Sequence, residues 1–554
     1  TYDSGTNCTA GIGRLCQVTD ASGTTQYGYD AYGNVTREQK TELGINYITT
    51  YTYDAGNRVL SLGTPDGRTI TYTRDALRRI TSVSATVNGS SQNLVSSRTY
   101  RPDGLLLSQT YGNGIAETKQ YDLQGRLTNQ FLGSADTRVY GYDANSNLTS
   151  LQSLPQVGSY TYDALDRLTV DSITSTPSST VNLSYDPNGN RTSDGTNTYS
   201  YTANSNQLNQ VGSNSITLDP AGNTTSDGTN TYSYNNDGHL QSVTQGTTSL
   251  GSYVYNFQRQ RTQKTANSST TVYHYDTNGN LILETGTDGT SKVTYVYAEN
   301  VPIAQITRTG GIDTVTYLHT DHEGTPRLGT DNTQAVVWRW EGGAFGNTPP
   351  TGTANVNLRF AGQYADAESG LFYGGDRYWD PRLGRSITAD RMDIRQHALR
   401  WQAVMGKVDV PSLQINSYAY VVNNPLRWID STGFEATAAA GAMSPPAPTA
   451  PTVRPLPPIS IPWWAVPSAA TTAILGGVAA ALYSPQLCKN EEDCLKEWRE
   501  AYERCKQLIY EQMQQAAGRK KKRNVTGVTG GYTDLEECAR GLVSERCGGN
   551  AVRY

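Results

Sequence analysis

Tyr27-Gly-Tyr-Asp-Ala-Tyr-Gly-Asn34 is the stretch that decides the fold, because variants of it recur along most of the chain. Tyr-x-Tyr has the period of two that places both rings on one face of a strand. The turn chemistry follows, since Asp bonds its own backbone and Gly or Asn accepts a positive φ. Each unit therefore predicts a β-hairpin of about twenty residues, and stacked hairpins make a continuous sheet. The pattern returns at Tyr51–Arg58, Tyr140–Asn147, Tyr160–Arg167, Tyr185–Asn190, Tyr232–Gly238 and Tyr273–Asn280.

The composition agrees with strands and turns. The 554 residues include 37 Tyr, 54 Gly and only 6 Phe, and tyrosine can bury its ring while its hydroxyl forms a hydrogen bond. The net charge of −5 gives the whole chain no basic, nucleic-acid-binding character.

These repeats resemble the YD repeats of the Rhs, teneurin and Tc-toxin C-component families, over roughly residues 1–433. In those families a strip of strands spirals into a hollow shell that encloses a cargo. The resemblance therefore implies a mainly β fold, in which YD-repeat hairpins form a spiralling β-shell. We expect the spiral to be incomplete, because the chain starts within the repeat pattern.

A distinctive stretch between Tyr317 and Phe434 interrupts the repeats. It contains Tyr-Leu-His-Thr-Asp-His-Glu-Gly-Thr-Pro-Arg327, Arg377-Tyr-Trp-Asp-Pro-Arg-Leu-Gly-Arg and Asn416-Ser-Tyr-Ala-Tyr-Val-Val-Asn-Asn-Pro-Leu-Arg-Trp-Ile-Asp. These ordered strings resemble the Rhs repeat-associated core. In that family the core caps the shell and carries an aspartyl autoprotease, which cuts just after the motif Asp-Pro-x-Gly-Leu.

Two aspartates match the protease motifs of this family. The resemblance maps one catalytic aspartate onto Asp390, in Gly-Arg-Ser-Ile-Thr-Ala-Asp, and the other onto Asp430, in Asp-Ser-Thr-Gly-Phe. Two carboxylates at short range share one proton, so one is a base and the other an acid at the same pH. A nearby guanidinium, such as that of Arg385, can hold one carboxylate ionised. We expect cleavage between Phe434 and Glu435.

The sequence departs from the family pattern in three places. Ser431 and Phe434 replace the usual Pro and Leu, and residues 391–415 resemble an insertion. The alternative to autoproteolysis is that Asp390 and Asp430 are turn or capping residues.

A second candidate site is the pair His319 and His322, which lies beside Asp321 and Glu323. Two histidines without a nearby cysteine are a weak zinc pattern. We interpret them as structural and predict neither a metal nor a cofactor.

The composition changes sharply after Gly433. Residues 435–468 are rich in Ala and Pro, which is typical of a linker. The apolar stretch Ala469–Tyr483 is shorter than the roughly twenty residues of a membrane span, and it either inserts into a membrane or is shielded inside the shell. The predicted division is 1–316 for the YD shell, 317–434 for the core, 435–468 for the linker, and 469–554 for the apolar segment and a small α-helical effector domain.

Two helices are predicted in this last domain. Asn490 can cap the first, and Thr533-Asp-Leu-Glu536 is a capping box for the second. Each helix bears two cysteines, and the tail has no histidine, so disulfides are favoured over zinc, with buried thiols as a third option. The disulfide candidates are Cys494, Cys505, Cys538 and Cys547.

A basic run lies between the two predicted helices. It is either a nucleic-acid or anionic-lipid site or a solvated loop. The run consists of Arg519, Lys520, Lys521, Lys522 and Arg523.

These features predict a secreted polymorphic toxin fragment, whose shell encapsulates an effector that self-cleavage after Phe434 releases, for interbacterial competition. The family resemblance implies an immunity protein, a type VI secretion apparatus and delivery into a target cell. Disulfides in the tail would favour an oxidising destination such as the periplasm. The residues assign no activity or target to the effector: the basic run favours a nucleic-acid-directed enzyme, and the apolar stretch Ala469–Tyr483 favours a membrane-active peptide. The alternative is a cell-surface or adhesion-type YD-repeat protein without a toxin.

Overall fold

The computed structural model describes residues 1–175, 178–390, 416–433 and 437–438. The chain divides into two compact units, Thr1–Leu456 and Pro457–Tyr554. The second unit lies wholly outside the described residues, and with it the predicted helical domain. In the described part of the first unit, the regular elements are β-strands and one short 3-10 helix, η2 (Val421–Asn423). The expectation of a mainly β fold is confirmed there.

Two long antiparallel sheets, with strands in sequence order, make up most of the first unit. The first sheet consists of β1 (Gln17–Asp20), β2 (Gly23–Tyr29), β3 (Val35–Glu42), β4 (Ile45–Tyr53), β5 (Val59–Gly63), β6 (Thr69–Arg74), β7 (Ile80–Val87), β8 (Ser90–Tyr100), β9 (Leu106–Tyr111), β10 (Ala116–Tyr121), β11 (Leu127–Leu132), β12 (Asp136–Tyr142), β13 (Leu148–Gln152), β14 (Val157–Tyr162), β15 (Leu168–Ile173) and β16 (Ser179–Asn182). The second sheet consists of β22 (Thr217–Leu218), β23 (Thr224–Ser226), β24 (Thr231–Tyr234), β25 (Leu240–Gln245), β26 (Thr248–Tyr255), β27 (Arg261–Ala266), β28 (Ser269–Tyr275), β29 (Leu281–Thr285), β30 (Ser291–Ala298), β31 (Val301–Thr309), β32 (Ile312–Thr320), β33 (Pro326–Thr330), β34 (Val336–Arg339) and β35 (Thr351–Gly352).

Smaller sheets join and follow these two. Between them lie β17 (Ser184–Tyr185), β18 (Arg191–Ser193), β19 (Tyr199–Tyr201), β20 (Leu208–Val211) and β21 (Asn214–Ser215). After them come β36 (Tyr364–Asp366), β37 (Leu371–Gly374), β38 (Arg377–Asp380), β39 (Arg385–Ser386), β40 (Trp428–Ile429) and β41 (Thr437–Ala438).

The second tyrosine of each repeat fastens its hairpin to the one before. Tyr142 donates its hydroxyl to the main-chain oxygen of Leu127 at 2.8 Å, and Tyr162 donates to that of Leu148 at 2.7 Å. A phenylalanine has no such donor, which explains the excess of Tyr over Phe. Equivalent bonds to upstream main-chain oxygens are made by Tyr29, Tyr53, Tyr100, Tyr121, Tyr185, Tyr201, Tyr234, Tyr255, Tyr275 and Tyr297.

Replacing Tyr142 by Phe is expected to lower the free energy of unfolding by about 1 kcal/mol, because a part-buried hydrogen bond is lost while the ring remains. Urea denaturation of the full chain measures the change. Tyr32→Phe is the matched control, since this ring is 79% exposed and should give no shift. Equal effects at both positions would contradict a fastening role for the hydroxyl.

The turn residues link neighbouring hairpins in the same way. Asp143 accepts bonds from the main-chain and side-chain nitrogens of Asn147, at 2.8 and 2.9 Å. The same Asn147 amide also donates to Asp166 in the next turn at 2.8 Å. The repeated Asp and Asn therefore close each turn and join it to the next one, as the turn chemistry predicts.

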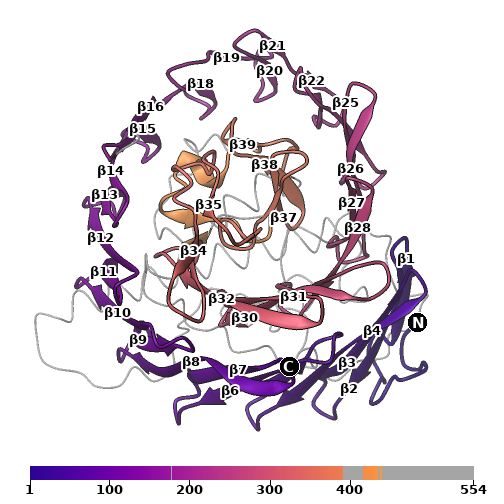
Figure 1. Cartoon of the computed structure of the whole chain (residues 1–554). Helices are drawn as coiled ribbons and strands as arrows, with labels where there is room; N and C mark the ends of the chain where they lie inside the picture. Colours follow the sequence, from indigo (N-terminus) through magenta and orange to yellow (C-terminus); the bar gives the residue numbers. More distant parts are fainter. Residues whose placement is uncertain (176–177, 391–415, 434–436, 439–554) are drawn as a thin grey trace, which may run out of the picture. The chain divides into compact units, whose positions relative to one another are not determined.

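The strands β1–β35 are together called the wall. The wall coils over itself, so the second sheet packs on the first. Hydrogen bonds join residues 190 to 245 positions apart, from Gln130 with the main-chain oxygen of Thr320 to Arg68 with Asp313. Apolar side chains of β4–β11 and β29–β33 form one core between the sheets. Figure 1 shows β30–β32 inside the arc of β6–β9. The spiralling arrangement expected from the repeats is therefore present in the described part of the first unit.

One contact between the sheets should make the protein sensitive to acid. Arg68 bonds both carboxylate oxygens of Asp313, at 2.7 and 2.5 Å, and lowers the pKa of Asp313 to about 2. Because the pKa of Asp313 is lower in the folded chain, this contact stabilises the fold at pH values above about 4, the pKa of an aspartate in the unfolded chain. The contribution disappears as the pH falls towards about 2.

Urea midpoints measured between pH 5 and pH 2 should therefore fall, and Asp313→Asn should lower the midpoint at pH 5 and flatten the decline. An unchanged pH dependence in this variant would contradict the assignment.

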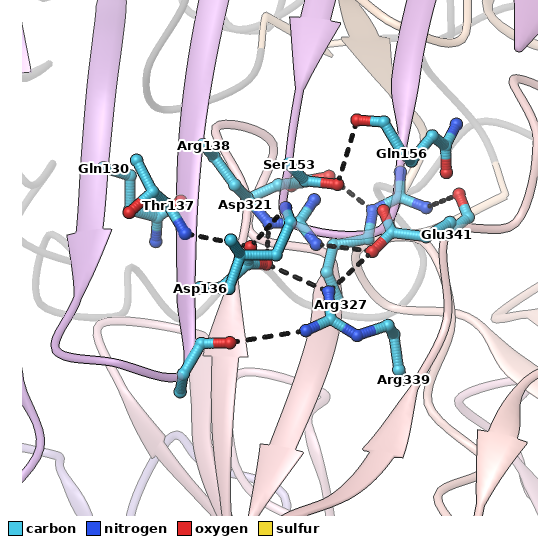
Figure 2. Close-up of polar contacts among 12 residues, drawn as sticks. Gln130, Asp136, Thr137, Arg138, Ser153, Gln156, Asp321, Arg327, Arg339 and Glu341 are labelled. Atoms are coloured by element: carbon cyan, nitrogen blue, oxygen red, sulfur yellow. Dashed lines mark hydrogen bonds and ion pairs between the residues drawn. The ribbon is translucent and has the colours of Figure 1, made fainter. Parts of the chain in front are cut away.

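A buried network of charged groups forms a second contact between the sheets (Figure 2). The Asp136 carboxylate accepts hydrogen bonds from Arg138 and from Arg339, both at 3.1 Å. Arg138 also donates a hydrogen bond to Glu341 at 2.9 Å. The Asp136 and Arg138 side chains are 0% and 1% exposed. Strand β12 of the first sheet supplies one half of the network, and the chain around β34 of the second sheet supplies the other. The network therefore joins the two sheets at this point.

The interior faces of both sheets pack against residues that follow β35. Figure 1 shows β37, β38 and β39 within the ring of strands. Arg261 on β27 is paired with Asp366 on β36, and tyrosine rings from the wall and from the inner segment surround its guanidinium. Asn424 donates to Asn147 of the wall at 2.8 Å. These contacts fix the inner segment that carries the candidate site.

Candidate active site

The hairpin β37–β38 positions the cation of the candidate site. Gly374 pairs with Arg377, which leaves a two-residue turn between the strands. Gly375 in this turn has φ +66°, a conformation that favours glycine. A Cβ at Gly375 would lie 2.4 Å from the main-chain oxygen of Thr432, so glycine also permits the close approach of the chain around residue 432.

Arg377 brings the two predicted catalytic aspartates together. Its Nη2 lies 3.1 Å from Oδ2 of Asp390 and 3.0 Å from Oδ2 of Asp430. Its Nη1 donates to the main-chain oxygen of Ser417 at 3.2 Å, which orients the guanidinium. Both carboxylates are nearly buried, with side-chain exposures of 4% and 5%. Residues 40 positions apart in the sequence thus share one guanidinium nitrogen.

Asp430 is buried, and aromatic side chains lie near it. The ring of Tyr420 lies against that of Trp379, with 4.2 Å between centroids. Burial, followed by the charge of Asp430, holds the pKa of the Tyr420 hydroxyl well above its usual range. A charge in such a place is weakly screened by water, so the Arg377 contact carries more weight than a surface ion pair would.

The chain after Asp430 is held against the hairpin. Asp430 accepts a bond from the Gly433 nitrogen at 2.8 Å, and the Asp376 nitrogen donates to the Thr432 oxygen at 3.1 Å. Strand β41 then pairs with β40, with Ile429 opposite Thr437. The predicted scissile bond, Phe434–Glu435, lies between these strands in sequence and outside the described residues.

Arg385, expected to support the aspartates, lies elsewhere. Its Nη2 donates to the main-chain oxygen of Asn206 at 2.8 Å, and its guanidinium lies 4.5 Å from the ring centroid of Tyr418. Burial lowers the pKa of Arg385. The structure thus gives Arg385 a contact with the wall and gives Arg377 the contact with the aspartates. Sequence reasoning missed Arg377, although it opens one of the core strings.

The histidines of the core are buried among wall residues. His319 bonds the Thr330 hydroxyl at 2.8 Å, and burial lowers the pKa of its imidazole to about 4. His322 bonds the main-chain oxygen of Leu426 at 3.0 Å. Asp321 is paired with Arg327 at 2.7 Å. In the described part of the chain, no group of three or more His, Cys, Asp and Glu residues could hold a metal ion.

The remaining predicted sites fall in the tail. The four disulfide candidates, the basic run 519–523 and the apolar stretch 469–483 all lie outside the described residues. Among described residues, no helix is long and apolar enough to cross a membrane. A disulfide does occur at the other end of the chain, between Cys8 and Cys16.

Comparison with known families agrees with the geometry of the wall. The teneurin YD-shell model matches residues 133–426, and the RHS repeat model matches residues 11–45 and 53–90. The chain belongs to the teneurin YD-shell family. A crystal structure of the TcdB2-TccC3-Cdc42 complex superimposes with a TM-score of 0.63 and 19% sequence identity, over 77% of this chain and 24% of that one. At this identity the likeness concerns the fold alone.

Two curated relatives show which proteins carry similar sequences. The tRNA nuclease WapA of Bacillus subtilis (strain 168) is 30% identical over 298 residues, which are 50% of this chain and 11% of WapA. The double-stranded DNA deaminase toxin A of Burkholderia cenocepacia (strain H111) is 32% identical over 139 residues, or 24% of this chain and 8% of that toxin. The matches therefore span only a small part of each relative.

Proposed function

We propose that this protein is a secreted polymorphic toxin, in which the YD-repeat shell (1–316) sequesters a C-terminal effector (469–554), and the core (317–434) frees it by self-cleavage. The observation that carries the proposal is the placement of Asp390 and Asp430 on one guanidinium, that of Arg377. The toxin among the relatives supports the same role.

The proposed reaction is hydrolysis of the Phe434–Glu435 peptide bond. The scheme requires one of the two carboxylates to be ionised and the other neutral, so that one acts as the base and the other as the acid. The ionised carboxylate takes a proton from a water molecule while the water oxygen bonds to the Phe434 carbonyl carbon. The neutral carboxyl group protonates the carbonyl oxygen. Collapse of the intermediate breaks the C–N bond: the proton held by the first carboxylate passes to the Glu435 nitrogen, and the second carboxylate takes back one hydroxyl proton as the Phe434 C=O bond re-forms.

Arg377 has a positioning role in this scheme. It contacts both carboxylates and is anchored through the Ser417 oxygen, so it holds the ionised carboxylate in place. The bonds from the Gly433 nitrogen to Asp430 and from the Asp376 nitrogen to Thr432 hold the chain that leads into the bond to be cut. This preorganisation lets a reaction within one chain proceed without a binding step.

Self-cleavage is tested with the purified full chain on a denaturing gel, followed by N-terminal sequencing. We expect a released fragment that begins at Glu435, and an intact chain for Asp390→Asn and for Asp430→Asn. Asp237→Asn, in an exposed turn, is the control and should be cut like the parent. An uncut parent chain, or normal cutting in either site variant, would reject the assignment.

The toxin role needs a separate test. Bacteria are made to express the full chain with and without an export signal, and growth is compared with that of cells expressing Asp430→Asn. Growth arrest that depends on Asp430 supports a released effector and, by extension, an immunity protein and a secretion apparatus as partners. Cleavage that leaves growth normal in both compartments would favour an adhesion role for the wall.

A further inference from the structure

A cavity lies between the two sheets, far in sequence from the aspartates. Its volume is about 270 Å³, and it is lined by β2–β4 of the first sheet and by β28 and the turn before β27 in the second. This is room for a small ligand or for the end of one long side chain.

Aromatic rings form much of its wall. Two of them have hydroxyls already bonded to main-chain oxygens, Tyr29 with Leu15 and Tyr275 with Arg261. Such rings offer their π-systems rather than their hydroxyls, and the negative face of a π-system attracts cations. The aromatic residues lining the cavity are Tyr27, Tyr29, Tyr47, Phe257, Tyr273 and Tyr275.

Glu38 gives the cavity an unmatched negative charge. It lies on β3 directly opposite Tyr27 on β2, and among the described residues its carboxylate has no hydrogen-bond or ion-pair partner. Burial, opposed in part by Lys40 and reinforced by Asp276, raises the pKa of Glu38 to about 7. The carboxyl therefore gains from any cation that enters the cavity.

The other charged groups around Glu38 are already compensated. Lys40 is paired with Glu42 at 2.8 Å. Asp276 accepts bonds from Asn280 within its own turn. His274 is neutral, because burial lowers the pKa of its imidazole to about 3. Lys40 therefore offsets the charge of Glu38 only in part, and neither Asp276 nor His274 supplies a positive charge.

We propose that this cavity binds a compact organic cation, a primary or quaternary ammonium group, which rests against the aromatic rings and pairs with Glu38. A neutral ligand would leave the carboxylate unmatched, and an anion would be repelled by it. Aromatic rings combined with a carboxylate are the chemistry by which proteins recognise such cations.

The first experiment is calorimetric titration of the full chain with choline and with Nα-acetyl-lysine amide, which present a quaternary and a primary ammonium. We expect saturable binding at one site for at least one of them. The neutral isostere of choline, 3,3-dimethylbutan-1-ol, should bind about tenfold more weakly or not at all. No saturable binding of either cation, or equal binding of the isostere, would overturn the proposal.

The pH dependence of choline binding is the second readout, because choline keeps its charge at every pH. Its affinity should rise about tenfold between pH 6 and pH 8, as Glu38 ionises. Burial raises the pKa of the facing hydroxyls of Tyr27, Tyr47 and Tyr51, and His274 is already neutral, so none of these groups titrates in this range. An affinity independent of pH would contradict the role of Glu38.

A variant pair completes the test. Glu38→Gln should weaken choline binding about tenfold at pH 8 and abolish the pH dependence, whereas Glu299→Gln, in an exposed turn, should change neither. Thermal melting of both variants checks that they are folded. If Glu38→Gln does not fold, the isostere comparison and the pH series on the parent chain still decide the question.

Discussion

Replacing Arg377 by methionine is expected to slow self-cleavage by about a hundredfold or more, because both aspartates lose the cation that they share. Methionine fills similar space without charge, so the hairpin should remain folded.

Arg377→Lys is the informative companion variant. An ammonium keeps the charge but cannot bond two carboxylates and the Ser417 oxygen in the same planar arrangement. We expect a rate between those of the parent and the methionine variant. Cleavage is followed as the intact fraction against time. A methionine variant that is cut at the parent rate would remove Arg377 from the scheme.

The second large effect is expected at the ion network of Figure 2. Asp136→Ala leaves the guanidinium of Arg138, whose side chain is 1% exposed, without its carboxylate partner on β12, and it also removes a partner of Arg339. The Leu154 nitrogen loses an acceptor at 3.0 Å as well. Breaking a buried pair in this way costs about 3–5 kcal/mol in the free energy of unfolding.

Urea denaturation measures this cost, with Asp103→Ala as the matched control. The Asp103 pair with Arg101 has side-chain exposures of 38% and 28%, so its loss should cost less than about 1 kcal/mol. A similar small shift for both variants would show that the network does not stabilise the wall.

The repeats could be predicted from the sequence because their information is local. Tyr-x-Tyr and Asp-x-x-Gly-Asn each specify a strand or a turn within a few residues, and the structure has both. The partner of each second tyrosine could not be predicted, since the accepting oxygen belongs to the preceding hairpin. Tyr142 and Leu127 illustrate a bond that only the stacking of hairpins reveals.

The candidate site shows the same division between local and distant information. The family motifs indicated Asp390 and Asp430, but proximity in sequence favoured Arg385 as their cation. Arg385 on β39 is directed instead to Tyr418 and Asn206. Arg377 reaches the aspartates because a two-residue turn reverses the chain just before it, a long-range consequence that spacing alone does not encode.

The tyrosine bonds between adjacent hairpins have a consequence for how such genes can change. The tyrosine bond of each hairpin involves only the hairpin before it, so duplication or loss of one repeat preserves these bonds. The contacts between the two sheets, such as Arg68 with Asp313, depend instead on how much chain separates them. Recombination that changes the number of residues between Arg68 and Asp313 would place residues that do not pair opposite each other in the two sheets. Length variation should therefore be inherited most easily outside the stretch where the wall overlaps itself.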